Sequence, residues 1–167
     1  MFEPINESHI LSGFDCGKPS LNNWLMQRAL SNHDNGFTSV IVAPIDNKVI
    51  GYYGLSPTAV SPKLLPRSIR TGQPPDPMPC ILLGRLAVDI SQKGKGLGTA
   101  LLHHALVRSV TAAKLVGGRA LLVNALDEEA IAFWFHRGFT ATHDDRFLMF
   151  IGMKEIERTL EGLRQLS

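Results

Sequence analysis

The stretch Lys93-Gly94-Lys95-Gly96-Leu97-Gly98 decides how this chain is interpreted, because a strand-like segment precedes it and a helix-like segment follows it. Residues 80–88 form an almost continuous apolar run, which is typical of a central strand that is covered on both faces. From Thr99 to about Leu115, apolar residues recur at helical spacing. A glycine-rich turn between a strand and a helix leaves backbone N–H groups free to bind phosphate. The stretch therefore predicts a site for a phosphorylated cofactor.

The spacing of the glycines excludes two common phosphate-binding motifs. A P-loop needs GxxxxGK[ST], and the chain contains no such string. A dinucleotide-binding turn needs Gly or Ala at the sixth position of GxGxxG, but this position is Thr99 when counted from Gly94 and Leu101 when counted from Gly96. The phosphate site must belong to another class.

Composition predicts one globular domain over residues 1–167, with 44% hydrophobic and 19% charged residues. The net charge of +2 is compatible with a nucleic-acid partner but does not require one. Cys16 and Cys80 match no metal-binding or redox motif, and we expect both to be free buried thiols. The start of the chain lacks the pattern of a signal peptide, and no apolar run approaches the ~18 residues of a membrane span. We therefore expect a cytoplasmic protein that does not interact with a membrane.

Periodicity and turn signals predict helices and strands on both sides of this segment. Ser20 is expected to cap the first helix, and Asp127 to begin the one that ends at Gly138. Seven of the ten prolines lie within residues 56–79, which we expect to be a largely irregular loop. The other expected elements are a helix over 20–30, a hairpin of 38–43 and 49–55, a short helix near 62–68, strands at 120–123 and 147–151, and a helix over 154–164.

A second motif, Ala130-Ile131-Ala132-Phe133-Trp134-Phe135-His136-Arg137-Gly138-Phe139, has the form A-x-x-F-x-x-x-x-G-F. Together with the glycine turn, this order of elements resembles the GCN5-related N-acetyltransferases, the GNAT family. The resemblance implies an α/β (α+β) fold with a central mixed twisted sheet and helices on both faces. It also implies that the central strands, here 83–89 and 120–124, splay apart around acetyl-CoA.

The resemblance assigns the acetyl-CoA contacts. The turn would hold the pyrophosphate, although the family's Gln or Arg is replaced by Lys93, which keeps the charge but lacks the planar fork. Because backbone amides do most of the binding, we expect acetyl-CoA binding to survive this change. The implied cofactor-binding residues are Leu86, Ala87, Val88, Lys93, Gly94, Lys95, Gly96, Leu97, Gly98, Thr99, Asn124 and Phe133.

Four further segments resemble acetyltransferase toxins of bacterial toxin–antitoxin pairs: residues 14–17, 21–25, 51–56 and 83–89. That resemblance implies acetylation of the α-amino group of aminoacyl-tRNA, which blocks translation, together with a homodimer and a neutralising ribbon-helix-helix antitoxin. Lys63, Arg67, Arg70 and Arg85 are the candidate tRNA contacts, and Lys95 could contact either tRNA or the CoA phosphates. The alternatives are an acetyltransferase for a small amine or a protein N-terminus, and a CoA-binding module with weakened catalysis.

Acetyl transfer needs a neutral amine, a donor for the carbonyl oxygen and a proton for the leaving thiolate. An α-amino group, with a pKa of ~7.7–8.0, needs little help from a base, whereas a lysine, at ~10.4, needs a strong one. No Glu or His is placed in the sequence for that task, which favours an α-amine acceptor. By resemblance, a backbone N–H near Ala87 or Val88 would stabilise the carbonyl oxygen.

The proton-donating tyrosine of the family should follow Phe133, but the chain has Trp134 and then Phe135 at these candidate catalytic positions. Neither side chain can donate a proton at neutral pH. Three interpretations stay open: Phe135 occupies the tyrosine position, by engineering or by nature; water or another residue, such as Tyr52 or Tyr53, protonates the thiolate; or activity is reduced.

Overall fold

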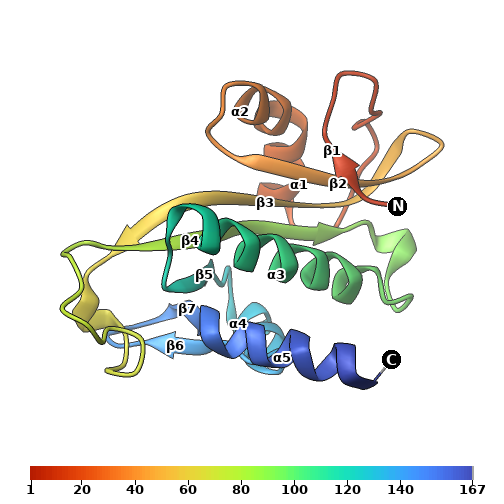
Figure 1. The fold of residues 1–167 in the computed structure, drawn as a ribbon. Helices are drawn as coiled ribbons and strands as arrows, with labels where there is room; N and C mark the ends of the chain where they lie inside the picture. The colour runs from red at the N-terminus through yellow and green to blue at the C-terminus, as the bar shows by residue number, and fades with distance from the viewer. Residues whose placement is uncertain (167) are drawn as a thin grey trace. The chain divides into compact units, whose positions relative to one another are not determined.

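The computed structural model describes residues 1–166, which form a mixed sheet and flanking helices (Figure 1). The strands are β1 (Glu3–Pro4), β2 (Ser39–Ile45), β3 (Lys48–Val60), β4 (Met78–Val88), β5 (Ala120–Asn124), β6 (Thr140–Thr142) and β7 (Asp145–Gly152). The α-helices are α1 (Pro19–Trp24), α2 (Leu30–Asp34), α3 (Leu97–Val116), α4 (Glu128–Phe135) and α5 (Met153–Leu166). The seven strands are hydrogen-bonded in the order β1-β2-β3-β4-β5-β7-β6, which confirms the predicted fold class. Sequence analysis missed the short strands β1 and β6.

Two compact units make up the described chain. The first contains Met1–Ser56 and Gly84–Ala105, and the second contains Pro57–Leu83 and the residues from Leu106 onward. Strands β3 and β4 and helix α3 each contribute residues to both units. The expectation of one domain over residues 1–167 stays a prediction.

The sheet of the first unit is built around the β2–β3 hairpin, which confirms the predicted pairing. Asp46 and Asn47 make the turn with positive φ values of 50 and 67, a conformation that these two residue types tolerate. On β3, the Tyr52 hydroxyl donates to the carbonyl of Leu21 beside α1, and Tyr53 pairs with His104 of α3. Because neighbouring strand residues point to opposite faces, helices cover both faces of this part of the sheet.

The predicted first helix is longer than expected and is not regular. A π-helical segment, Leu25–Ala29, separates α1 from α2, and its buried residues Leu25 and Ala29 join the core of the first unit. The predicted Ser20 cap is wrong: Lys18 occupies the N-cap without a side-chain capping bond. Pro19 takes the first helical position, where its fixed φ is favourable and its missing N–H costs no hydrogen bond.

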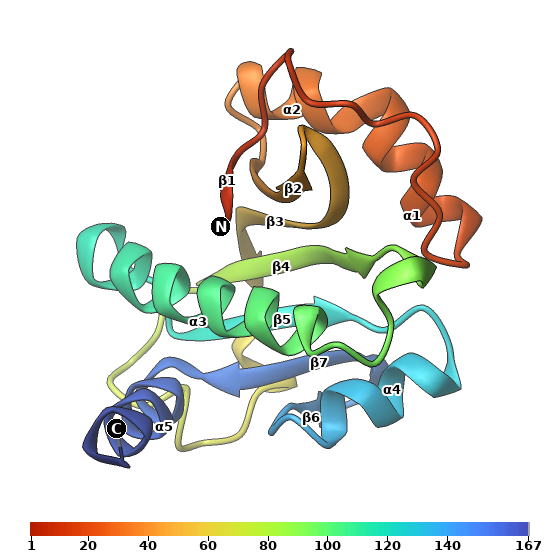
Figure 2. The ribbon, with the colours of Figure 1, turned by 90° about the vertical axis from the view of Figure 1, so that its right-hand side faces the viewer.

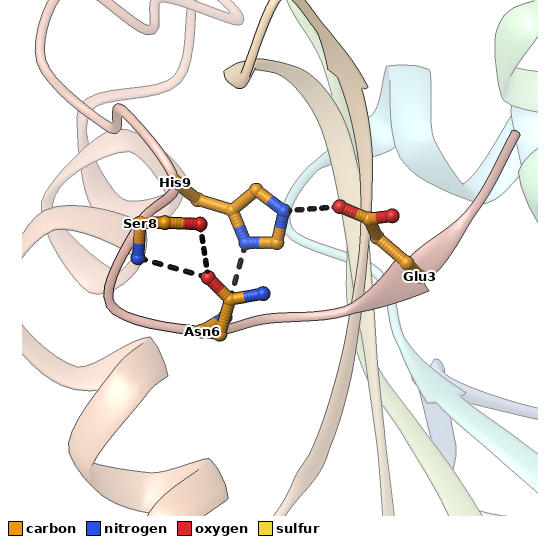
Figure 3. Close-up of polar contacts among 4 residues, drawn as sticks. All are labelled: Glu3, Asn6, Ser8 and His9. Atoms are coloured by element: carbon orange, nitrogen blue, oxygen red, sulfur yellow. Dashed lines mark hydrogen bonds and ion pairs between the residues drawn. The ribbon is translucent and has the colours of Figure 1, made fainter.

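Close to the N-terminus, a buried imidazole fastens β1 to the segment after it (Figure 3). His9 Nδ1 accepts the N–H of Asn6 at 3.0 Å, so the other ring nitrogen carries the proton and donates to Glu3 Oε1 at 2.6 Å. Ser8 donates to the Asn6 side chain rather than to the imidazole. The cluster is therefore a structural clasp, and its Ser–His–Glu composition does not form a hydrolytic triad.

In the second unit, β4 pairs with β5 in parallel and β5 pairs with β7 antiparallel. Helices α4 and α5 both pack against β7, and Figure 2 shows α5 alongside this strand. The proline-rich loop contains only a one-turn 3-10 helix, Pro62–Leu64, in place of the short helix expected over 62–68. Strand β4 begins at Met78, so the end of this loop is regular, contrary to the prediction.

The hydrophobic cores follow the predicted apolar runs. Cys16 lies in the core of the first unit and Cys80 in that of the second, both as free buried thiols, which confirms that prediction. Among residues 1–166, no helix is both long and apolar enough to cross a membrane.

Candidate active site

The glycine-rich turn lies in the first unit, between the end of β4 and the start of α3. A short 3-10 helix, Ile90–Gln92, leads into it. Gly94 and Gly96 have φ values of 77 and 82, and no atom lies within 4 Å of the place that a Cβ would take on either residue. Glycine is thus required at these positions by backbone conformation rather than by crowding.

Several backbone N–H groups of the turn are free to bind a ligand. The first helical hydrogen bond of α3 runs from the N–H of Ala100 to the carbonyl of Gly96, at 3.0 Å. Within residues 1–166, no protein group accepts a hydrogen bond from the N–H of Gly94, Gly96, Gly98 or Thr99. These groups precede the N-terminal end of a 20-residue helix or lie in its first turn, where the helix dipole favours an anion. The predicted phosphate site therefore has the donors that it needs.

Asp89 fastens the start of the turn to the N-terminal part of the same unit. Its carboxylate accepts the N–H of Asp15 at 3.0 Å and the N–H of Ser91 at 3.0 Å. The N–H of Ile90 in turn donates to the Asp15 carbonyl at 2.8 Å. Burial by itself raises the pKa of Asp89, but the two backbone N–H groups outweigh it and hold the pKa below its ordinary value. The carboxylate is therefore ionised at neutral pH and makes charge-assisted hydrogen bonds.

One of two glycines near this turn allows the backbone of the first unit to pack closely. A Cβ on Gly51 of β3 would lie 2.9 Å from Leu101 Cδ1 and 3.3 Å from the carbonyl oxygen of Ala87. A Cβ on Gly98 would make only an ordinary 3.7 Å contact with Val88. Gly51 thus allows α3 to pack tightly against β3. At position 98, by contrast, there is room for a Cβ, so packing does not require glycine there.

The last residues of β4 provide the other predicted cofactor contacts of the first unit. Ala87 is buried in the core beneath α1, whereas Leu86 and Val88 are half-buried. Lys93 and Lys95 are exposed, so both ammonium groups are available to a phosphate. The predicted contacts over residues 86–88 and 93–99 therefore lie together in the first unit.

The remaining predicted cofactor and catalytic residues lie in the second unit. Asn124 ends β5 and is exposed, while α4 begins after Asp127, whose side chain accepts the N–H of Ala130 at 2.8 Å. This cap confirms the predicted helix start. On α4, Phe133 is half-buried and lies under the guanidinium of Arg137, 3.7 Å from its centre.

The two candidate catalytic positions have opposite environments. Trp134 is only 7% exposed, and its ring packs edge-to-face against Phe133 at 4.9 Å and Phe139 at 5.1 Å. Phe135 is 63% exposed. Trp134 is a core aromatic residue, and neither side chain carries a hydroxyl. That a tyrosine position was changed at Trp134 or Phe135 stays a prediction.

The alternative proton donors, Tyr52 and Tyr53, are both fully buried in the first unit. The Tyr52 hydroxyl donates to the Leu21 carbonyl at 2.7 Å, and burial raises the pKa of Tyr52 above its ordinary value. The Tyr53 oxygen lies 2.6 Å from His104 Nδ1. A raised pKa makes Tyr52 a weaker acid, so its geometry favours a structural role.

The candidate tRNA contacts divide between the units. Lys63 and Arg67 are exposed and Arg70 is half-buried, all on the proline-rich loop of the second unit. Arg119 fastens this loop by donating to the carbonyls of Ile69 and Thr71, at 2.6 and 3.0 Å. Arg85, in the first unit, stacks on the ring of Trp24.

Sequence analysis missed the roles of Asp89 and Trp24. Asp89 ends the segment 83–89, and its place just before a glycine turn was the signal that it caps the turn. Trp24 is half-buried and supports the Arg85 guanidinium. Nothing in the spacing of residues 24 and 85 could have indicated that contact.

Comparison with known proteins identifies the class of enzyme. The sequence profile of the acetyltransferase (GNAT) family matches residues 7–139. The chain belongs to the GNAT family of acetyltransferases. This confirms the resemblance that the two motifs indicated, and with it acetyl-CoA as the acetyl donor used by the family.

Several relatives of this GNAT chain are toxins. It is 40% identical over 151 residues to the tRNA-acetylating toxin of Mycobacterium tuberculosis, covering 90% of both chains. It is also similar to AtaT complexed with acetyl-methionyl-tRNAfMet, with a TM-score of 0.87, 29% identity, and coverage of 96% of this chain and 98% of the other. A tyrosine-to-phenylalanine mutant of AtaT, bound to the C-terminus of the antitoxin AtaR and to acetyl-CoA, has a TM-score of 0.80 at 29% identity, with coverage of 95% and 96%.

Proposed function

We propose that this GNAT enzyme transfers the acetyl group of acetyl-CoA to the α-amino group of an aminoacyl-tRNA and thereby blocks translation. The observation that carries the proposal is the 40% identity to a tRNA-acetylating toxin over 90% of both chains. The free N–H groups of the turn support it, because they fit the pyrophosphate of acetyl-CoA.

Acetyl-CoA supplies an acyl group that is already activated as a thioester. The amine nitrogen forms a bond to the carbonyl carbon, the carbon–sulfur bond breaks, the amine loses a proton to solvent, and the thiolate takes one up. The turn residues would hold the cofactor, and a backbone N–H near Ala87 or Val88 would stabilise the carbonyl oxygen. An α-amino group with a pKa of ~7.7–8.0 is partly neutral at physiological pH, so the chain needs no dedicated base.

The exposed basic residues Lys63 and Arg67, with Arg70 beside them on the loop, would contact tRNA phosphates. Lys95 could contact either the tRNA or the CoA phosphates. Phosphate contacts release counterions, so binding of tRNA should fall steeply as the salt concentration rises.

Similarity to the AtaT toxin also supports a proposal for how the activity of this chain is regulated. The AtaT structure with the antitoxin AtaR supports neutralisation of this chain by a cognate antitoxin, which we propose is of the ribbon-helix-helix type. We further propose that the enzyme forms a homodimer and acts in the cytoplasm, where charged tRNA is found.

The test is acetyl transfer from radiolabelled acetyl-CoA to charged total tRNA, with uncharged tRNA, a polyamine and a short peptide as competing acceptors. We expect the label only on charged tRNA, and we expect mild alkali to release it as an N-acetylated amino acid. Label on the polyamine or the peptide would instead favour a small-amine or protein N-terminal acetyltransferase. CoA binding without transfer would favour a binding module.

A further inference from the structure

In the first unit, Arg85 lies over the ring of Trp24, which also stacks on Tyr52. Its guanidinium carbon is 4.3 Å from the centre of the Trp24 ring. The Trp24 ring is nearly parallel to that of Tyr52, at 13° and 5.9 Å between ring centres. A guanidinium over an indole is favourable through cation–π attraction, which orients the planar group without satisfying its N–H donors.

No protein acceptor completes the environment of Arg85. Within residues 1–166, no oxygen accepts a hydrogen bond from its guanidinium and no carboxylate pairs with it. In the second unit, by contrast, Arg119 donates to two carbonyls, and Arg146 pairs with Glu128. Because no group within residues 1–166 accepts from this half-buried guanidinium, its N–H donors are available to a ligand.

The supporting side chains hold this geometry firmly. The Tyr52 hydroxyl donates to the Leu21 carbonyl at 2.7 Å, which ties the sheet to α1 three residues before Trp24. The π-helical segment Leu25–Ala29 begins directly after Trp24. Such segments are uncommon and occur frequently at functional sites.

The position of Arg85 on β4 indicates what it would bind. It precedes Ala87 by two residues, a distance of about 7 Å along a strand. In the proposed reaction the acceptor amine attacks near Ala87 or Val88, so Arg85 would meet a group a few bonds away from that amine. In an aminoacyl-tRNA, the anionic group nearest to the acceptor amine is the phosphodiester that joins the last two nucleotides.

We propose that Arg85 binds the phosphodiester of the 3′-terminal nucleotide of the acceptor, with Trp24 as the platform that orients its planar fork. The inference rests on the proposed function. Paired N–H donors of arginine match two phosphate oxygens.

The test compares two small acceptors: an aminoacylated CCA trinucleotide, which contains this phosphate, and an aminoacyl-adenosine, which lacks it together with the two cytidines and the phosphate between them. For Arg85→Gln we expect the KM for the trinucleotide to rise about tenfold or more, since a charged hydrogen-bonded pair is lost. We expect the KM for aminoacyl-adenosine and for acetyl-CoA to change less than about twofold, because these contacts do not involve the lost pair. Arg85→Lys should be intermediate, because it keeps the charge but not the fork.

The matched control is Arg28→Gln, which removes an exposed arginine from the π-helical segment of the same unit and should leave all three KM values unchanged. Thermal unfolding of each variant checks that it is folded. If Arg85→Gln does not fold, the KM values of Arg85→Lys provide the test. An equal KM increase for both acceptors, or an increase for acetyl-CoA alone, would overturn the inference. Wild-type inactivity on full-length charged tRNA would instead reject the proposed function, so the two failures are distinguishable.

Discussion

The turn between β4 and α3 and the helix α4 each carry a motif of the family, but they depend on different atoms. In the turn, backbone N–H groups, among them those of Gly94, Gly96, Gly98 and Thr99, have no protein acceptor within residues 1–166. On α4, the family resemblance predicts a proton-donating side chain, and the buried Trp134 is a candidate for its position. We therefore predict that a side-chain change such as Lys93 is tolerated where the backbone binds the ligand, whereas a side-chain change on α4 alters the chemistry.

The largest expected effect comes from changing the backbone of the turn. Gly96→Val places a β-branched residue at a φ of 82 and should weaken acetyl-CoA binding about thirtyfold or more, because several charge-assisted N–H contacts are displaced. Isothermal titration calorimetry with CoA measures this change. Gly36→Val is the matched control, since Gly36 has a φ of 78 and equally open space in another turn of the same unit. If both variants bind CoA equally well, the turn is not the phosphate site.

A smaller effect is expected on α4. Trp134→Tyr should raise the turnover of acetyl transfer about tenfold, because a positioned acid can contribute ~10²–10⁴-fold and the wild-type chain lacks one at this position. Steady-state kinetics with charged tRNA provides the measurement. Trp134→Phe is the control: it introduces a ring of the same size as tyrosine but without the hydroxyl, and it should not raise the turnover.

Phe135→Tyr completes this test of the α4 motif. Because Phe135 is 63% exposed, a hydroxyl there should leave turnover unchanged. A gain only at residue 135 would mean that the motif is aligned one position later than the Phe133 pattern suggests. No gain at either position would show that the thiolate is protonated without this helix.

The smallest expected effect concerns the support of the turn. Asp89→Asn should lower the free energy of unfolding by about 1–2 kcal/mol at neutral pH, because two backbone N–H groups lose a charged acceptor. The pKa of Asp89 is lowered in the folded state, so this stabilisation is present above the unfolded pKa of about 3.9 and is lost as the pH falls through the folded pKa.

Urea unfolding of the wild type and of Asp89→Asn between neutral and acidic pH measures the effect. The difference between the two proteins should be constant near neutrality and shrink below about pH 4. A difference that stays the same at acidic pH would mean that the Asp89 carboxylate does not provide the stabilisation through its charge.

Local sequence patterns predicted the structure correctly where interactions between residues close in sequence determined it. The run before the turn became β4, the positive φ residues Asp46 and Asn47 made the hairpin turn, and Asp127 capped α4. These patterns gave incomplete predictions where contacts between residues distant in sequence determined the structure. The helix predicted over 20–30 extends to Asp34 through a π-helical segment whose buried residues pack into the core. Strand β1 has only two residues and depends on pairing with β2.

The sequence by itself determined the strand–turn–helix that can hold acetyl-CoA, because glycine spacing and apolar periodicity are local properties of the chain. It also placed Trp134 and Phe135, which cannot donate a proton, where the family resemblance predicts a tyrosine. Only the tertiary structure decided that Asp89 fastens the turn to Asp15 and that Arg85 rests on Trp24 with no acceptor among the described residues, 1–166. These contacts join residues about 60 or more positions apart, and only packing of the folded chain brings such residues together.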